Sequence, residues 1–502
     1  MKTKYIQHVG LVLLLMFLGS CKKWVDYNPR EDFRITELDY LKSESDYRTM
    51  AVSAYTPTQW MTYMPMIGDI ASDNSVSGGE NASDVLSFQQ IDDYTHTSVN
   101  ANLTEIWQAA YEGINRCNYL HQYKESNPAG QKIDFAGKEA LYGEVYFLRA
   151  HYYFSLVKLF GDVPLFTDKR LSLNDSKKLQ RAPKANVYQQ IETDLANAIA
   201  VLPANQVQKG RITKYAAHAL LGKVLLYQGK YSQAAEKLQP IIDANAFSLV
   251  NNFASIFLAS GENGSESVFE IQYSNTSPYY NWAGPTRGQG NLAVQMCGIR
   301  GLNGSANMPY ASGWSFNLPT QNLVNAYETG DQRKAATILD IEAYKNANPS
   351  FAITYQVAPY KNTGYYNQKY HPRKAETSGQ LELNYLNNYR TIRYADVLLM
   401  AAEAYAKSTT PDITKAQNYL NQVRRRAFGD NLHDITATGD ALYQAILEER
   451  RLELAMEGER FFDLVRTGQT SKITGFVKGK HEVFPIPQRE VDISGLVQNN
   501  GY

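Results

Sequence analysis

The sequence predicts a mostly α-helical protein in which antiparallel helical pairs form a curved scaffold, with long irregular loop excursions and little β structure. Apolar residues recur every three or four positions through residues 100–250 and 388–470, which is the spacing that lines one face of a helix. Residues 251–387 largely lack that period. The prediction is therefore a helical repeat scaffold in the first two regions and a loop-rich excursion between them, all within a single domain over residues 21–502.

The start of the chain has the pattern of an export signal that ends in a lipid attachment site. Lys2 and Lys4 precede the apolar run Val9–Leu18, which suits a signal peptide and is shorter than the roughly 20 residues of a membrane-spanning helix. The following Gly19-Ser20-Cys21 resembles the processing box of bacterial lipoproteins, in which the cysteine is acylated after cleavage. We predict a signal peptide over residues 1–20 and lipidation of Cys21. An ordinary signal peptide is the alternative.

The next predicted elements are two helical pairs. Leu103–Tyr123 and Lys138–Phe160 have helical periodicity, and the second ends at a glycine. Residues Leu221–Ala235 then align without gaps with a tetratricopeptide unit, in which small residues let two helices approach closely. Gly229 is predicted to break the first helix of that unit, and Tyr231 to start the second.

A looser copy of the same unit follows over residues 392–427, with a longer turn between its helices. Such pairs cannot bury their apolar faces alone, so they are expected to stack. Between the helical regions, Asn251–Pro319 is rich in Gly, Ser, Asn, Tyr and Trp and includes the strand-like Ser267–Tyr273. Gly68–Val99 and residues 341–388 are also irregular. Loops of this length are usually functional or disordered, and the aromatic content argues against disorder.

Composition excludes several classes of function. Lys+Arg and Asp+Glu both number 50, so no charge excess indicates a nucleic-acid partner. Besides Cys21 only Cys117 and Cys297 occur, which is neither a disulfide framework nor a metal-binding cluster. No metal or cofactor is predicted, although Asp92 and Asp93 are left as either calcium ligands or ordinary loop residues.

Hydrolysis is the catalytic alternative that the sequence raises. Glu449, Glu453 and Glu457 are four residues apart and are predicted to share one helix face, and a glycosidase needs a pair of carboxyl groups. Arginines in the same segment would keep these three carboxylates ionised, so none of them could act as the acid. The arginines are Arg450, Arg451, Arg460 and Arg466. We therefore predict a structural ion-pair network and no enzyme.

An ordered set of motifs runs along nearly the whole chain. After the lipid attachment box come Leu148–Phe154, Phe160–Leu165, Gly313-Trp314 with Pro319-Thr320 and Ala326–Glu328, Ile392–Leu399, Glu449–Glu453 with Glu457-Gly458, Arg460, Asp463-Leu464 and Arg466, Phe484–Pro487 and Gln498–Tyr502. In this order they resemble the SusD/RagB-like outer-membrane lipoproteins. The resemblance implies a non-catalytic protein at the cell surface that captures oligosaccharides or other nutrients and delivers them to a TonB-dependent transporter of the SusC type.

A sugar site needs flat aromatic faces that stack on the ring, with polar groups around its edge. The segment from residue 279 offers that mixture, and the resemblance implies that the pocket also uses the loop after Ser72-Asp73-Asn74. The predicted ligand-binding residues are Asp73, Asn74, Tyr279, Tyr280, Asn281, Trp282, Arg287 and Trp314. Alternatively, Asp73 and Asn74 cap a turn, and the aromatic residues pack in the protein. A different alternative for the whole chain is a tetratricopeptide adaptor that binds a protein segment.

Overall fold

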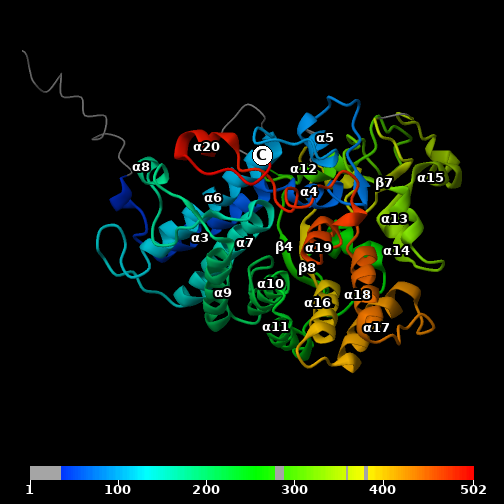
Figure 1. Ribbon diagram of the computed structural model, residues 1–502. Helices are drawn as coiled ribbons and strands as arrows, with labels where there is room; N and C mark the ends of the chain where they lie inside the picture. Colours follow the sequence, from blue (N-terminus) through cyan, green and yellow to red (C-terminus); the bar gives the residue numbers. More distant parts are fainter. Residues whose placement is uncertain (1–35, 277–287, 358–359, 378–382) are drawn as a thin grey trace, which may run out of the picture. The chain divides into compact units, whose positions relative to one another are not determined.

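The structure, a computed structural model, describes residues 36–276, 288–357, 360–377 and 383–502 (Figure 1). These residues are mostly α-helical, as predicted. Their strands are short and pair two by two in antiparallel ladders. Over the described residues no helix is long and apolar enough to cross a membrane.

The chain divides into two compact units. In its described part, the smaller unit consists of residues 36–47 and 123–134. It begins with the 3-10 helix η1 (Glu37–Asp39), and in it the Tyr47 hydroxyl donates a hydrogen bond to the Tyr123 carbonyl at 2.9 Å. The larger unit consists of residues 48–122 and 135–502. The boundaries of the signal peptide, the helical regions and the loop-rich region given above stay predictions.

The first predicted helical pair is present in the larger unit. Helix α6 (Ala101–Gln122) packs on α7 (Lys138–Phe160), and α9 (Lys184–Val201) packs on α7 in turn. Helix α7 ends at Gly161, whose φ of +72° lies in the region that favours glycine. Nearly all of α7 is buried, including Arg149, which forms a 2.7 Å ion pair with Asp194 of α9.

The tetratricopeptide-like pair is also confirmed. Helices α10 (Lys214–Tyr227) and α11 (Tyr231–Asp243) are separated by a turn in which Gly229 has a φ of +69°. The side chain of Thr213 caps α10 by accepting a hydrogen bond from a backbone amide. A Cβ atom placed on Gly222 would lie 2.5 Å from the Leu238 side chain. Only a glycine therefore allows the two helices to approach this closely.

The second copy of the unit is formed by α16 (Tyr394–Lys407) and α17 (Ile413–Phe428), and α11 packs on α16. Helix α18 (Gly439–Glu453) packs against both α16 and α17. The helices α9, α10, α11 and α16 thus follow one another from left to right across the lower part of Figure 1, with α18 and α17 beyond α16. This is the stacked helical scaffold that the periodicity predicts.

The rest of the larger unit consists of short elements. The strand pairs are β1 (Ser75–Val76) with β5 (Leu318–Pro319), β2 (Val163–Pro164) with β3 (Arg181–Ala182), β4 (Ser267–Ile271) with β8 (Tyr389–Arg393), and β6 (Ile338–Asp340) with β7 (Tyr365–Asn367). The remaining α-helices are α3 (Glu44–Trp60), which begins in the smaller unit, α4 (Met64–Ile70), α5 (Leu86–Asp92), α8 (Leu173–Ser176), α12 (Leu292–Cys297), α13 (Gln321–Ala326), α14 (Arg333–Thr337), α15 (Ile341–Ala347), α19 (Arg460–Arg466) and α20 (Gln488–Ser494). The remaining 3-10 helices are η2 (Phe253–Phe257), η3 (Ala259–Gly261), η4 (Pro349–Phe351), η5 (Lys374–Glu376) and η6 (Thr470–Lys472). Strand β4 begins where predicted and ends two residues earlier.

The C-terminal carboxylates form a buried ion-pair network, with one correction to the prediction. Helix α18 ends at Glu453, so Glu457 lies in the turn that follows and does not share its helix face. The chain leaves the helix there because Met456 and Gly458 both have positive φ. Glu457 nevertheless joins the network through the 2.7 Å ion pair with Arg393.

The arginines that neutralise these carboxylates come from elsewhere in the sequence. Arg333 of α14 pairs with Glu449 at 2.6 Å and with Glu453 at 3.0 Å, and Arg393 of β8 pairs with Glu453 at 2.9 Å. Of the arginines in the segment itself, Arg450 pairs with Asp396 and Asp463, and Arg466 with Glu403 and Asp463. The network therefore joins the loop-rich region to the helical scaffold. Cys117 and Cys297 are buried free thiols elsewhere in the core.

Candidate functional site

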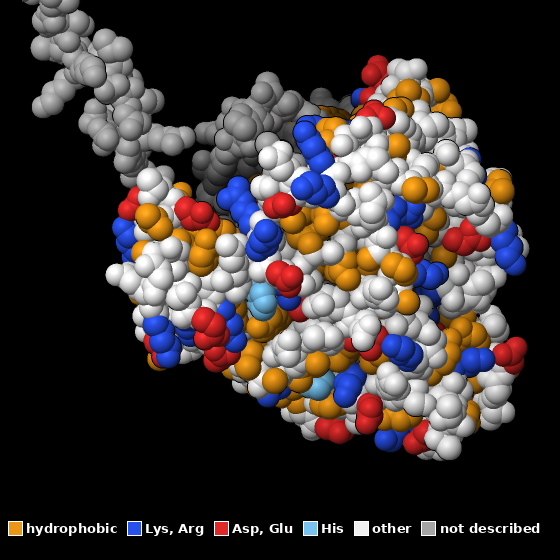
Figure 2. Space-filling model, turned by 60° about the vertical axis from the view of Figure 1, so that its left-hand side comes forward, with side chains coloured by type: hydrophobic (Ala, Val, Ile, Leu, Met, Phe, Trp, Pro, Cys, Tyr) orange, Lys and Arg blue, Asp and Glu red, His pale blue; other side chains and the backbone are white. Residues whose placement is uncertain are grey.

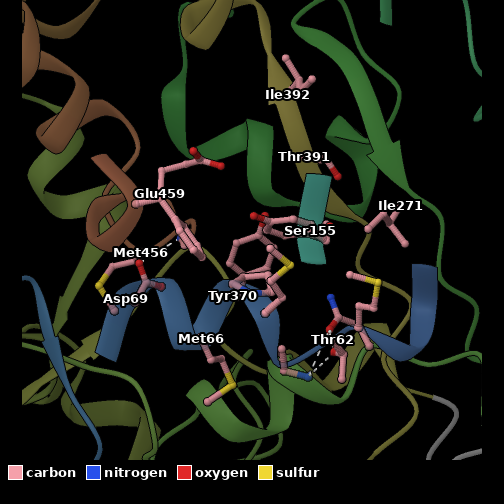
Figure 3. A pocket seen from close by; sticks show the side chains of 18 of the residues that line it. Thr62, Met66, Asp69, Ser155, Ile271, Tyr370, Thr391, Ile392, Met456 and Glu459 are labelled. Atoms are coloured by element: carbon pink, nitrogen blue, oxygen red, sulfur yellow. Dashed lines mark hydrogen bonds between the residues drawn. The ribbon is translucent and has the colours of Figure 1, made fainter. Parts of the chain in front are cut away.

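A cavity lies in the interior of the larger unit, between the helical scaffold and the short elements (Figure 3). Its wall is largely apolar and includes Met61, Met64, Met66 and Met456. The cavity volume is about 70 Å³. Pockets for small ligands usually measure roughly 300–1,000 Å³, whereas a few water-sized molecules fit into this cavity. The cavity is therefore too small for an oligosaccharide.

The charged groups of the cavity are stabilised by the protein itself. The Lys158 ammonium lies over the rings of Phe154 and Phe462, at 4.9 and 4.4 Å from their centroids, and burial lowers the pKa of Lys158 to about 8. Asp69, which also lines the cavity (Figure 3), accepts hydrogen bonds from the Asn317 side chain and from the Gly458 amide. Burial raises the pKa of Asp69 to about 7. These contacts indicate that Lys158 and Asp69 have a structural role.

Three loops meet on the surface and form what is here called the loop surface: residues 77–87, 298–316, and 354–361 without the undescribed residues 358–359. Strands β1 and β5 bring the first two loops together. The Gly79 amide then donates to the Ser315 carbonyl, and the Tyr360 amide to the Gly79 carbonyl, both at 2.8 Å. The third contact runs from the Gln356 amide to the Arg300 carbonyl at 3.0 Å.

The side chains of the loop surface combine an aromatic ring with charged groups. Trp314 is partly exposed, and its carbonyl accepts a hydrogen bond from the Arg300 guanidinium at 3.1 Å. The same guanidinium forms ion pairs with Asp84 and, at 3.8 Å, with Glu80. The Glu80 side chain is 63% exposed, whereas those of Asp84 and Arg300 are 24% and 18% exposed. The pair is thus fixed in place while still within reach of a ligand.

The loop surface also carries exposed apolar side chains. Leu86 is 53% and Val357 67% exposed, and Tyr360 is partly exposed beside Lys361. A partly exposed aromatic ring can stack on the C–H face of a sugar, and a fixed carboxylate–guanidinium pair can bind the hydroxyl groups of that sugar. The loop surface therefore has the chemistry of a carbohydrate site.

Two of the predicted residues, Asp73 and Asn74, lie just before β1 and contact arginines. Arg460 donates to both carboxylate oxygens of Asp73, at 2.7 and 2.8 Å, and Arg451 donates to the Asn74 amide oxygen at 2.9 Å. Burial raises the pKa of Asp73, but the hydrogen bonds and charge of Arg460 and the charge of Arg451 outweigh this effect, so its pKa is lowered. Both residues hold the start of the loop that leads to the loop surface. Their contact with a ligand stays a prediction.

Five of the predicted residues lie outside the described part of the chain: Tyr279, Tyr280, Asn281, Trp282 and Arg287. The described residues on either side of them meet, because the Ser274 amide donates to the Gln289 carbonyl at 2.9 Å. The chain then enters the buried helix α12, and the Trp314 amide donates to the Gln295 carbonyl of that helix at 2.9 Å. The described chain that follows this gap therefore contacts Trp314 through helix α12.

Sequence reasoning did not identify Arg300 and Asp84 as site residues. They are 216 positions apart, and no local motif marks either one. Asp92 and Asp93, which were left as either calcium ligands or ordinary loop residues, both contact the Lys361 ammonium, at 2.7 and 2.6 Å. The Lys361 ammonium of the protein itself therefore bridges these two carboxyl groups.

Comparison with known proteins agrees with the fold. The model of the SusD family matches residues 265–483, and a second model, described as starch-binding associating with outer membrane, matches residues 23–226. A solved structure described as a laminarin binding SusD-like protein is 35% identical, with a TM-score of 0.82 over 92% of this chain and 100% of that chain. This chain belongs to the SusD family.

Other SusD-family members cover nearly the same length. The SusD-like protein P2 of Formosa agariphila is 27% identical over 98% of this chain and 99% of its own length. Surface glycan-binding protein A from Bacteroides thetaiotaomicron, solved in complex with laminarihexaose, is 26% identical, with a TM-score of 0.78 over 91% of this chain and 100% of that chain. Both the helical scaffold and the excursions are therefore shared with these relatives.

Proposed function

We propose that this SusD-family protein binds oligosaccharides at the cell surface without cleaving them, and passes them to a TonB-dependent transporter of the SusC type. The observation that supports the proposal most directly is the partly exposed Trp314 beside the Arg300–Asp84 pair on the loop surface. We choose a laminarin-type glucan as the ligand to test first, because two of the similar structures are described with laminarin or laminarihexaose.

The state of the C-terminal carboxylates supports binding without hydrolysis. A glycosidase needs one carboxyl group that stays protonated near neutral pH. Burial raises the pKa of Glu453, but the charges of Arg426, Arg393 and Arg333 outweigh that effect and hold its pKa well below the usual range. Glu449 and Glu457 are buried in ion pairs with other cations. All three carboxylates are thus engaged in ion pairs.

Location at the outer membrane is supported by two observations. The predicted lipid on Cys21 would tether the mature protein to a membrane, and the family model that matches residues 23–226 describes proteins associating with outer membrane. A transporter partner is proposed from the family resemblance. Isolation of the lipidated protein from membranes tests both points, because a copurifying barrel transporter is expected.

The test of the site is calorimetric titration of the purified protein with laminarin oligosaccharides. Trp314→Ala is expected to weaken binding by about 1 kcal/mol or more, since the stacking face is lost. Trp60→Ala, which removes the same ring type from α3, is the matched control and should leave the affinity unchanged. Shortening of the oligosaccharide during incubation would contradict the proposal, as would equal affinity of the Trp314 variant and the wild type.

A further inference from the structure

We propose that a second surface, formed by residues 168–184, α20 and the chain end around Val497, lies against an anionic lipid surface. It is called the basic face below. The proposal depends on the lipid anchor of the proposed function, because an anchor keeps the protein body near a bilayer. The basic face shares no residue with the loop surface, so a glycan and a membrane would not compete for the same side chains.

The first observation is an excess of unpaired positive charge. Residues 168–184 contain six basic and two acidic side chains. The basic residues are Lys169, Arg170, Lys177, Lys178, Arg181 and Lys184. Lys169 lies 3.8 Å from Asp175, whereas four exposed residues, Arg170, Lys177, Lys178 and Lys184, form no ion pair within the described part of the chain. Exposed cations of this kind attract lipid phosphate groups.

The second observation is a set of exposed aliphatic side chains beside these cations. Arg181 connects the two groups, because its guanidinium donates to the Val497 carbonyl at 2.7 Å and to the Asn499 side chain. Val497 is 72% exposed, and Ile493 at the end of α20 is 49% exposed. Val99 is 70% exposed and follows Ser98, whose carbonyl accepts a hydrogen bond from the Gln488 amide.

Figure 2 shows the side of the molecule that carries α8 and α20. In that view, Lys and Arg side chains lie among hydrophobic and acidic side chains. Helix α20 also carries Glu490 and Asp492, so the positive charge of the face comes from residues 168–184. The basic face thus presents two kinds of group, unpaired cations and exposed aliphatic chains.

This combination indicates which partner fits. A soluble polyanion would use the cations and leave the aliphatic side chains in water. A lipid surface uses both, because cations meet the headgroup phosphates and aliphatic side chains enter the boundary with the acyl chains. Residues 22–35 separate the predicted lipid on Cys21 from the first described residue. At about 3.5 Å per extended residue, this tether keeps the body within roughly 50 Å of the anchor.

The experiment measures binding of the unlipidated mature chain, residues 22–502, to vesicles. This chain contains every described residue. We expect it to cosediment with phosphatidylcholine vesicles that contain phosphatidylglycerol, and at least about tenfold less with phosphatidylcholine alone. Replacing Arg170, Lys177, Lys178 and Lys184 by Gln is expected to weaken binding to the anionic vesicles about tenfold or more. Ile493→Ser with Val497→Ser should weaken it as well.

The matched control replaces Lys209, Lys214, Lys237 and Lys334 by Gln, which changes the net charge equally at positions outside the basic face. It should bind vesicles like the wild type. No binding to anionic vesicles, or equal loss in the control, would overturn the proposal. The proposal would also be overturned if replacing the four basic residues weakened vesicle binding while Ile493→Ser with Val497→Ser did not. That result would favour a soluble polyanion as the partner. Laminarin titration of the same variants should be unchanged, which separates a failure here from a failure of the glycan site.

Discussion

Single charged residues buried in the core of this protein are held there by partners of opposite charge. Arg393 is 1% exposed and contacts the carboxylates of Glu266, Glu453 and Glu457. Each of these carboxylates would be expensive to bury alone, and the arginine compensates because its planar group can serve several acceptors at once. The stability of the network therefore depends on all of its members being present.

Removal of this arginine tests that dependence. Arg393→Ala leaves buried carboxylates without their cation and is expected to lower the free energy of unfolding by about 3–5 kcal/mol. Arg425→Ala is the control, because Arg425 pairs with Asp434 at an exposed position and should change stability by less than about 1 kcal/mol. Urea denaturation of both variants measures the difference. A similar small change in both would show that the buried pairs contribute no more than exposed ones.

At the scale of single residues, the sequence predicted which residue types neutralise each other. It did not predict which individual residues pair. The sequence correctly indicated that arginines neutralise the C-terminal glutamates. It pointed to arginines of the same segment, whereas Arg333 and Arg393 come from other elements, 116 and 60 positions from the glutamates they contact. Asp84 and Arg300 were missed for the same reason. No local pattern encodes a contact between distant side chains, so only the fold could reveal these pairs.

Among the elements, those with a strong local signal were predicted well. Gly229 and Tyr231 mark the turn and the second helix start of the tetratricopeptide-like unit as expected. Glu457 was misplaced, because the helix stops at Glu453 and backbone with positive φ at Met456 takes the chain out of it. Periodicity continues across such a stop, so it cannot locate one where the residue is not a glycine or proline.

The contact between α10 and α11 offers a test of the element packing. Gly222→Ala puts a methyl group 2.5 Å from the Leu238 side chain, and overpacking of this kind costs about 1–3 kcal/mol. The double variant Gly222→Ala with Leu238→Ala should lose less stability than the sum of the two single variants, because the second change makes room for the first. Thermal or urea denaturation measures this coupling. Strict additivity would mean that the two side chains do not meet.

On the scale of the whole molecule, buried histidines link stability to pH. Burial lowers the pKa of His96 to about 4 and those of His151 and His371 to about 3. A histidine whose pKa is depressed on folding stabilises the native state above its unfolded value near 6.5, and this contribution is lost as the pH falls toward the folded value. Burial raises the pKa of Asp69 and Asp92. These two carboxyl groups therefore favour the native state as the pH falls, which is opposite to the effect of the histidines.

The variant His151→Gln separates the contribution of this histidine to the pH dependence of stability from those of the other titratable groups. Between pH 7 and pH 5, the wild type is expected to lose about 2 kcal/mol of stability relative to His151→Gln, since only the wild type must keep that imidazole neutral. His433→Gln, at a half-exposed loop position, is the control. Urea denaturation at both pH values measures the difference. A His151 variant with the same pH dependence as the wild type would contradict the assigned burial effect.

The methionine-lined hollow has a mechanical consequence. A hollow of about 70 Å³ is internal space that the side chains do not fill, and the volume decrease on unfolding scales with internal space of this kind. Hydrostatic compression favours whichever state occupies less volume. The larger unit should therefore yield to high pressure more readily than an equally stable protein whose interior is filled.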